Sequence, residues 1–167
     1  MHYSQLNKFD TVNGTGIRVS LFVSGCDIKC KGCFNKEAWD FNYGKEFTNE
    51  TLNEILHHLD NPYVKGLSIL GGEPLAEKNR DTVYDVCKTV KSMLPTKDIW
   101  LWSGYKKSKI EKDFPKILDT IDVLVDGSFV EKDKNTNLLF RGSNNQKIYV
   151  KCGNIFCKVK SKEKLCI

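Results

Sequence analysis

The sequence contains no run of 18 or more apolar residues, so we expect no membrane-spanning helix. Residues 1–5 show no basic segment followed by an apolar one, so we expect no secretory signal and a cytoplasmic protein. Internal repeats, low-complexity tracts and Ser/Gly/Pro-rich linkers are also absent. The 167 residues suffice for one domain with a core, but not for a complete eight-stranded (β/α) barrel, which needs about 250 residues.

The charge of the chain is unevenly distributed. Residues 1–146 hold 20 basic and 20 acidic side chains, whereas residues 147–167 hold six lysines and one acid, Glu163. A nucleic-acid-binding domain usually carries a basic face on its folded body, so the neutral body argues against nucleic acid as a partner. We interpret the lysine-rich end as a solvated terminus, with docking onto an acidic partner as the alternative.

Hydrophobic patterns predict that strands and helices alternate along the chain. Runs of apolar and β-branched residues predict strands at residues 17–23, 67–70, 99–102 and 121–125. Apolar residues at helical spacing predict one helix that begins after Thr48 and a second one that ends at Pro95. Ser108 and Glu111 suggest a capping box for a third helix.

This alternation, with short connections, is typical of parallel strands in βαβ units. Because the chain is too short for eight units, we expect an α/β fold of the open, partial (β/α) barrel kind. In such folds ligands bind at the carboxyl ends of the strands. A chemically suggestive segment follows each predicted strand, so we expect four segments to converge: Cys26, Gly71 to Glu73, Ser103-Gly104 and Asp126-Gly127.

Residues 147–159 predict a C-terminal β-hairpin around the turn Gly153-Asn154. In the predicted register Cys152 faces Ile155. Cys157 faces Val150, which puts the two thiols on one face about 7–8 Å apart, at or beyond the reach of a disulfide. No histidine lies nearby to complete a zinc site, so we interpret the cysteines of this end as half-buried thiols, with a metal or redox role as the alternative: Cys152, Cys157 and Cys166.

Three of the seven cysteines, Cys26, Cys30 and Cys33, lie within eight residues at the spacing C-x3-C-x2-C. In a reducing compartment such a cluster indicates metal or redox chemistry. Structural zinc usually takes four ligands in two C-x2-C pairs, whereas thiolates of one short loop suit an iron–sulfur cluster. Three ligands on a four-iron cluster leave one iron open to a substrate. Zinc, or reduced thiols without metal, are the alternatives.

Two neighbours of these cysteines are also candidate cofactor-binding residues. Gly32 allows the loop to wrap tightly, and Phe34 is placed to pack beside a bound ligand or to shield the cluster. Cys87, in contrast, falls on the apolar face of a predicted helix, where we expect a core role.

The cysteine spacing resembles the motif of the radical S-adenosylmethionine (SAM) enzymes. The resemblance implies a partial barrel of the radical SAM type in which Cys26, Cys30 and Cys33 hold a [4Fe-4S] cluster. It also implies that the fourth iron chelates SAM and that one electron splits SAM into methionine and a 5′-deoxyadenosyl radical. The Gly71-Gly72-Glu73 segment is similar to the superfamily's GGE element, which binds the SAM amino group. Glycines permit close backbone approach, and a carboxylate pairs with an ammonium.

Within this superfamily the chain is most similar to the glycyl-radical activases of anaerobic ribonucleotide reductases. The similarity covers a radical SAM core at residues 1–147 and leaves residues 148–167 as a lysine-rich C-terminal extension. It rests on the following segments: residues 10–18, which resemble (D/N)GPGxR with Thr15 in place of the proline, and residues 33–36, Trp39, 98–105, 125–127 and 141–146.

This narrower resemblance implies that the chain generates a glycyl radical on the large subunit of the reductase. It further implies a low-potential electron donor such as a flavodoxin. Arg141 is interpreted as either a SAM contact or a partner-docking residue. Two alternative functions are a radical SAM enzyme for a small, pterin-like substrate and a non-catalytic iron–sulfur or zinc module.

Overall fold

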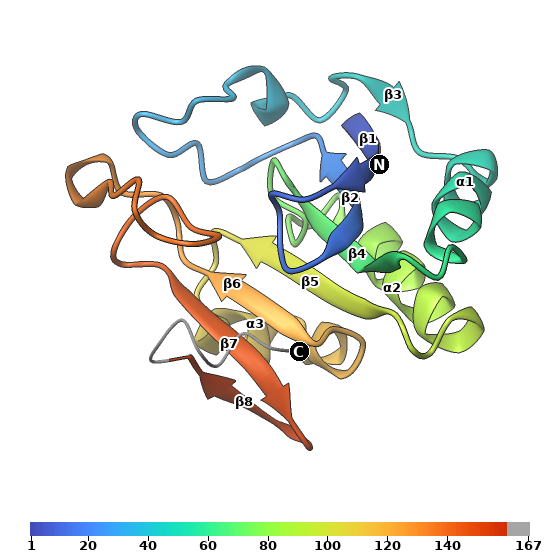
Figure 1. The fold of residues 1–167 in the computed structure, drawn as a ribbon. Helices are drawn as coiled ribbons and strands as arrows, with labels where there is room; N and C mark the ends of the chain where they lie inside the picture. The colour runs from blue at the N-terminus through green and yellow to red at the C-terminus, as the bar shows by residue number, and fades with distance from the viewer. Residues whose placement is uncertain (160–167) are drawn as a thin grey trace.

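The computed structural model describes residues 1–159. Its strands form one eight-stranded sheet in the order β3-β1-β2-β4-β5-β6-β7-β8 (Figure 1). The strands are β1 (His2–Asp10), β2 (Ile17–Val23), β3 (Lys45–Glu46), β4 (Val64–Gly71), β5 (Asp98–Ser103), β6 (Val123–Asp126), β7 (Lys147–Cys152) and β8 (Ile155–Lys158). The helices are α1 (Asn49–Leu59), α2 (Arg80–Met93) and α3 (Lys107–Asp113), with short 3-10 helices at Glu37–Trp39, Pro115–Asp119 and Glu131–Asp133.

The expected open, partial (β/α) barrel of the radical SAM type is wrong. Only the four central strands, β2, β4, β5 and β6, pair in parallel. β1 and β3 continue the sheet antiparallel on one side, and β7 and β8 do so on the other. The three helices provide only three crossovers, too few to wind a barrel of parallel strands. The molecule is therefore a small α/β domain built on a mixed sheet.

The helices cover one face of this sheet. Val19 and Leu21 of β2 are fully buried in a core with Ile55 of α1 and Val86 of α2. The strand predicted at residues 17–23 is confirmed as β2. Alternate residues of a strand point to opposite faces, and consecutive residues of β2 are buried, so this strand packs on both sides. α1 begins after Thr48, whose side chain accepts the backbone N–H of residue 51, as predicted.

The capping box expected for the third helix is wrong. α3 begins at Lys107, and the preceding Lys106 makes no side-chain capping bond. Glu111 instead forms an ion pair with Lys107 one turn away. Such pairs support a short helix without fixing where it begins.

On the face opposite the helices, the loop between β6 and β7 packs against the sheet. A second core gathers Trp100, Val123 and Val125 with Ile148 of β7. The Phe140 ring meets Trp100 edge-on, with centroids 5.1 Å apart. The C-terminal hairpin extends the sheet, because β7 pairs with β6 and β8 pairs with β7. β7 also contributes Ile148 to this second core.

The hairpin has the predicted register, since Cys152 faces Ile155 and Cys157 faces Val150. The expected boundary between residues 147 and 148 falls at the start of β7, and the division into a core and an extension stays a prediction. Cys166 lies outside the described residues. No helix within residues 1–159 combines the length and apolar character needed to cross a bilayer.

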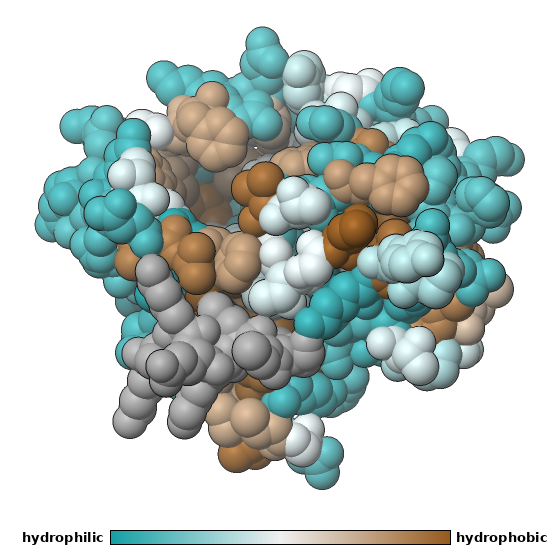
Figure 2. All heavy atoms as spheres, viewed as in Figure 1, coloured by the Kyte–Doolittle hydropathy of each residue, from teal (hydrophilic) through white to brown (hydrophobic). Residues whose placement is uncertain are grey.

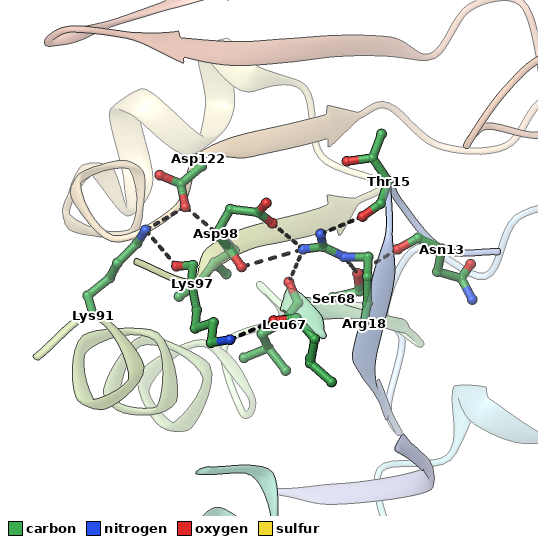
Figure 3. A network of polar contacts seen from close by, with 11 residues as sticks. Asn13, Thr15, Arg18, Leu67, Ser68, Lys91, Lys97, Asp98 and Asp122 are labelled. Carbon is green, nitrogen blue, oxygen red and sulfur yellow. Dashed lines mark hydrogen bonds and ion pairs between the residues drawn. The ribbon is translucent and has the colours of Figure 1, made fainter. Parts of the chain in front are cut away.

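Arg18 ties the amino ends of the parallel strands together (Figure 3). Its buried guanidinium donates to Ser68 Oγ at 2.7 Å and to the Leu67 carbonyl at 2.9 Å, and it pairs with Asp98. It also donates to the Thr15 carbonyl at 3.2 Å, which fastens the loop before β2. The segment expected to resemble (D/N)GPGxR thus lies at the edge of the sheet opposite the cysteines.

Candidate metal and cofactor site

Segments that follow the parallel strands meet at the carboxyl edge of the sheet. Glu73, after β4, is only 1% exposed. Its carboxylate accepts the Ser103 hydroxyl at 2.8 Å and the Gly104 N–H at 2.7 Å, both after or at the end of β5. The N–H of Gly127, after β6, donates to the Tyr105 carbonyl at 3.2 Å. The structure therefore brings together the segments that the sequence predicted to converge.

The Gly-Gly-Glu segment is joined to the start of the cysteine loop by its backbone. The Glu73 N–H donates to the Gly25 carbonyl at 2.8 Å. The buried Asn79 amide donates to the carbonyls of Ser24 at 2.9 Å and Glu73 at 3.0 Å. At Gly72 a Cβ would lie 2.5 Å from the Gly25 carbonyl oxygen, so only glycine permits this approach. Cys26, which follows Gly25, is thereby fixed beside Glu73.

The three cysteines lie on one tight loop. Cys26 is buried, while Cys30 and Cys33 are half-buried. The Cys33 N–H donates to the Cys30 carbonyl at 3.1 Å. Gly32 has φ of +74° and Lys29 has φ of +49°, the left-handed region in which the chain reverses over few residues. This local geometry keeps the three cysteines on one short loop.

Backbone N–H groups point at two of these sulfurs. Burial raises the pKa of the Cys26 thiol, while N–H donors of Ile28 and Lys29 act in the opposite direction. Burial likewise raises the pKa of Cys30, and the N–H of Phe129 opposes that shift. N–H donors directed at sulfur stabilise thiolates and tune iron–sulfur clusters.

The donor set fits an iron–sulfur cluster better than a hard cation. Within residues 1–159, no three Cys, His, Asp or Glu side chains already surround one point as ligands of a single ion. The candidate donors of the loop are nonetheless three thiols, two of them served by backbone N–H groups, and soft thiolates select iron–sulfur or zinc chemistry. Cys87 is no part of this set, because it is fully buried in the core and burial raises its pKa to about 12.

The buried Glu73 carboxyl has no cationic partner among the described residues. Burial raises its pKa to about 7, although the hydrogen bonds from Leu75, Ser103 and Gly104 favour the ionised form. The nearby Asp27 adds to the upward shift. A ligand ammonium would supply the positive charge that this carboxylate lacks.

Phe34 is fully exposed, at 101% of its reference surface, and projects from the end of the cysteine loop. Three residues of the site were missed in the sequence. Asn79 and Phe129 act through contacts described above, and the Tyr105 hydroxyl donates to the Asp27 carboxylate. No spacing identifies such residues, because each contact exists only after distant segments pair. A weak signal marks Asn79 alone, since asparagine is common just before a helix.

Comparison with known proteins identifies the family. Residues 12–149 match the family described as a 4Fe-4S single cluster domain. A protein of Enterobacteria phage T4 named anaerobic ribonucleoside-triphosphate reductase-activating protein is 42% identical over 149 residues. The aligned part covers 89% of this chain and 94% of the phage protein. The chain belongs to the family of anaerobic ribonucleoside-triphosphate reductase-activating proteins.

Other members of this reductase-activating family are similarly close. The proteins of Escherichia coli K12 and Vibrio cholerae that carry the same name are 40% and 41% identical over 151 residues. Each match covers 89% of this chain and at least 97% of the relative. The resemblance to reductase activators found in the sequence is confirmed. The 4Fe-4S family match spans the cysteine loop, Glu73, the turn at residues 141–146 and the first residues of β7.

Proposed function

We propose that this chain activates an anaerobic ribonucleoside-triphosphate reductase by generating a glycyl radical on its large subunit. The cofactors are a [4Fe-4S] cluster, held by Cys26, Cys30 and Cys33, and SAM. When bound, they supply one-electron cleavage of the sulfonium S–C5′ bond, which yields methionine and a 5′-deoxyadenosyl radical able to take the α-hydrogen of a glycine. The names of the relatives support the target, since those proteins are named as activators of this reductase.

One observation carries the proposal: the three-cysteine loop and the buried Glu73 carboxylate are held side by side. The Glu73 N–H bond to Gly25 and the two bonds of Asn79 fix this arrangement in the backbone. A thiolate set and an unpaired carboxylate at one edge suit a ligand that meets the cluster and presents an ammonium.

The roles of the other residues follow from this arrangement. Gly71 and Gly72 permit close approach of their backbone to Val23 and Gly25, which places Glu73 beside the cysteine loop. Glu73 then holds the ammonium of the ligand. Gly32 and Phe34 flank Cys33 in the sequence; Phe34 is fully exposed, and the contact of these two residues with a ligand stays a prediction. The buried surroundings of Glu73 exclude water, which strengthens electrostatic contacts with the ligand.

The partners follow from the chemistry. A glycine of the large reductase subunit must reach the site as part of a polypeptide. On the face that the helices leave uncovered, the surface is hollowed between the segment after β2 and the segment after β6 (Figure 2). A low-potential electron donor such as a flavodoxin must reduce the cluster, and half-buried Cys30 and Cys33 keep the loop near the surface.

The test is SAM cleavage under anaerobic conditions with dithionite, with and without the large reductase subunit. We expect about four irons per chain after reconstitution, release of 5′-deoxyadenosine, and a glycyl-radical doublet in electron paramagnetic resonance when the reductase is present. The Cys30→Ala variant should lose cleavage, whereas Cys87→Ala, a core cysteine, should keep it. Zinc in place of iron, or a wild-type chain that cleaves SAM without ever producing the doublet on the reductase, would contradict the proposal.

A further inference from the structure

The segment between β6 and β7 ends in a turn, residues 141–146, that is closed by its own side chains. The amide oxygen of Gln146 accepts the N–H groups of Gly142 at 2.8 Å and Ser143 at 3.1 Å. The amide nitrogen of Gln146 donates to the Gly127 carbonyl at 2.9 Å, just beyond β6. The turn is therefore fixed to the same edge of the sheet as the candidate site.

The residue before the turn is held in a rare backbone conformation. Phe140 has φ of +59°, a region that bulky side chains seldom adopt and that costs free energy. Its carbonyl accepts the Trp102 indole N–H at 2.7 Å, and its ring lies edge-on against Trp100. These two contacts hold Phe140 in place and so fix the direction in which the chain presents Arg141.

Arg141 carries a donor without an acceptor. One terminal nitrogen, Nη1, donates to the Gln146 carbonyl at 2.8 Å. Nε is buried and has no hydrogen-bond partner in the part of the chain that the structure describes. Within residues 1–159 no carboxylate pairs with this guanidinium either. A buried, unpaired donor on a permanently charged group is costly, so its acceptor is expected to come from a ligand.

The turn lies beside the cysteine loop. A Cβ on Gly142 would be 3.2 Å from the Phe129 ring, so the two residues are in contact distance. The backbone N–H of Phe129 lies close enough to the Cys30 sulfur to oppose the rise of its pKa. Only one residue thus separates the turn from a candidate cluster ligand.

The turn is linked to Glu73 through two intervening residues, Ser128 and Gly104. The Asn145 amide donates to the Ser128 carbonyl at 2.8 Å. A Cβ on Gly104 would lie 3.6 Å from the Ser128 Cα, and the Gly104 N–H donates to the Glu73 carboxylate. The turn that carries Arg141 therefore lies on the same rim as the cysteine loop and the unpaired carboxylate.

We propose that Arg141 binds a carboxylate of the ligand that occupies this site. The inference rests on the proposed function, which places SAM between the cysteine loop and Glu73. An amino acid end bears an ammonium and a carboxylate on one carbon; Glu73 is suited to the first and Arg141 to the second. An acidic side chain of the large reductase subunit offers the same chemistry, and the experiment distinguishes the two sources.

The experiment measures binding, without reductant, to the reconstituted holoprotein. Equilibrium dialysis gives the dissociation constants of SAM and of decarboxylated SAM for the wild type, Arg141→Gln and Arg141→Lys. Loss of a charge-assisted bond should weaken SAM binding by Arg141→Gln about ten- to a hundredfold, with decarboxylated SAM unchanged within about twofold. Arg141→Lys keeps the charge and should fall between. The control Lys147→Gln removes a neighbouring exposed charge and should change neither constant.

Circular dichroism and iron content, unchanged in Arg141→Gln, show that the turn still folds. A parallel measurement of affinity for the large reductase subunit tests the second source. If Arg141→Gln weakens binding of the reductase but not of SAM, the carboxylate belongs to the partner. If the wild type binds no SAM at all, the proposed function fails, and the reductase measurement still tests the role of Arg141. Equal weakening of both SAM forms, or no change in any affinity, overturns the role of Arg141.

Discussion

The guanidinium of Arg18 lies 2.5 Å from the carboxylate of Asp98, and the Arg18 side chain is fully buried. The guanidinium also stands over the Trp100 ring, 5.3 Å from its centroid. Arg18 therefore has a counter-charge, an aromatic face and carbonyl acceptors inside the sheet (Figure 3). This pair organises the amino ends of the parallel strands and is remote from the cysteine loop in the topology.

Breaking this pair should destabilise the fold strongly. Arg18→Met leaves the Asp98 carboxylate buried without its partner, and we expect a loss of about 3–5 kcal/mol in the free energy of unfolding. The measurement is urea unfolding of the reduced apoprotein. The Asp98→Asn change should lower the free energy of unfolding much less in the Arg18→Met background than in the wild type. Additive losses would show that the two groups do not interact.

The buried Glu73 carboxyl makes stability depend on pH. Its pKa is raised from 4.5 to about 7, so the folded chain binds this proton more tightly than the unfolded chain. The contribution of this carboxyl to the free energy of unfolding should therefore be largest below pH 4.5 and fall as the pH rises to about 7. The upper bound of this contribution is about 3 kcal/mol.

The control for this linkage is Glu73→Gln, which does not titrate. The difference in unfolding free energy between wild type and variant, followed from pH 4 to 8, isolates the contribution of the one carboxyl. A difference that stays constant over this range would mean that the Glu73 pKa is not raised.

Two glycines that differ in their surroundings should respond differently to alanine. At Gly72 the new Cβ would meet the backbone oxygens of Gly25 and Ala38 at 2.5 and 2.9 Å. We expect Gly72→Ala to cost roughly 2–4 kcal/mol. Gly153 in the hairpin turn has open space around it and φ of +62°, so Gly153→Ala should cost only about 1–2 kcal/mol. Similar losses at both positions would contradict the close approach at Gly72.

The hairpin cysteines should be dispensable for iron. Cys152 and Cys157 face Ile155 and Val150 in the hairpin, on strands that extend the sheet beyond β6. We expect Cys152→Ser/Cys157→Ser to retain the wild-type iron content after anaerobic reconstitution. Cys26→Ser, in the matched control, should lose it. A drop in iron for the hairpin variant would assign these thiols to the metal site.

The centre of the fold could be predicted from the sequence, but its margins could not. The run at residues 17–23 is rich in apolar and β-branched residues, and Thr48 is a strong helix start, so both elements were found where predicted. β1 was missed because it is polar, partly exposed and irregular in its pairing with β2. The antiparallel pairing of β7 with β6 follows a long loop without an α-helix, which no local pattern reveals.

The site divides in the same way. The cysteine spacing and the Gly-Gly-Glu segment are local, so they could be recognised as candidates in the sequence. The supports of the site, such as the Asn79 amide and the Phe129 N–H, depend on segments separated by 50 or more residues. Their contribution arises from tertiary packing, and the sequence carries no separate mark of it.

The backbone contact at Gly72 has a consequence for genome surveys. Glycine is required there by the neighbouring peptide oxygens, whether or not any cofactor ever binds. A paralogue that had lost its cysteines and its catalysis would still need that glycine to fold. In a search for active members, the Gly-Gly pair therefore reports inherited architecture, and under the proposed function the cysteine triplet is the feature that separates working members from degenerate copies.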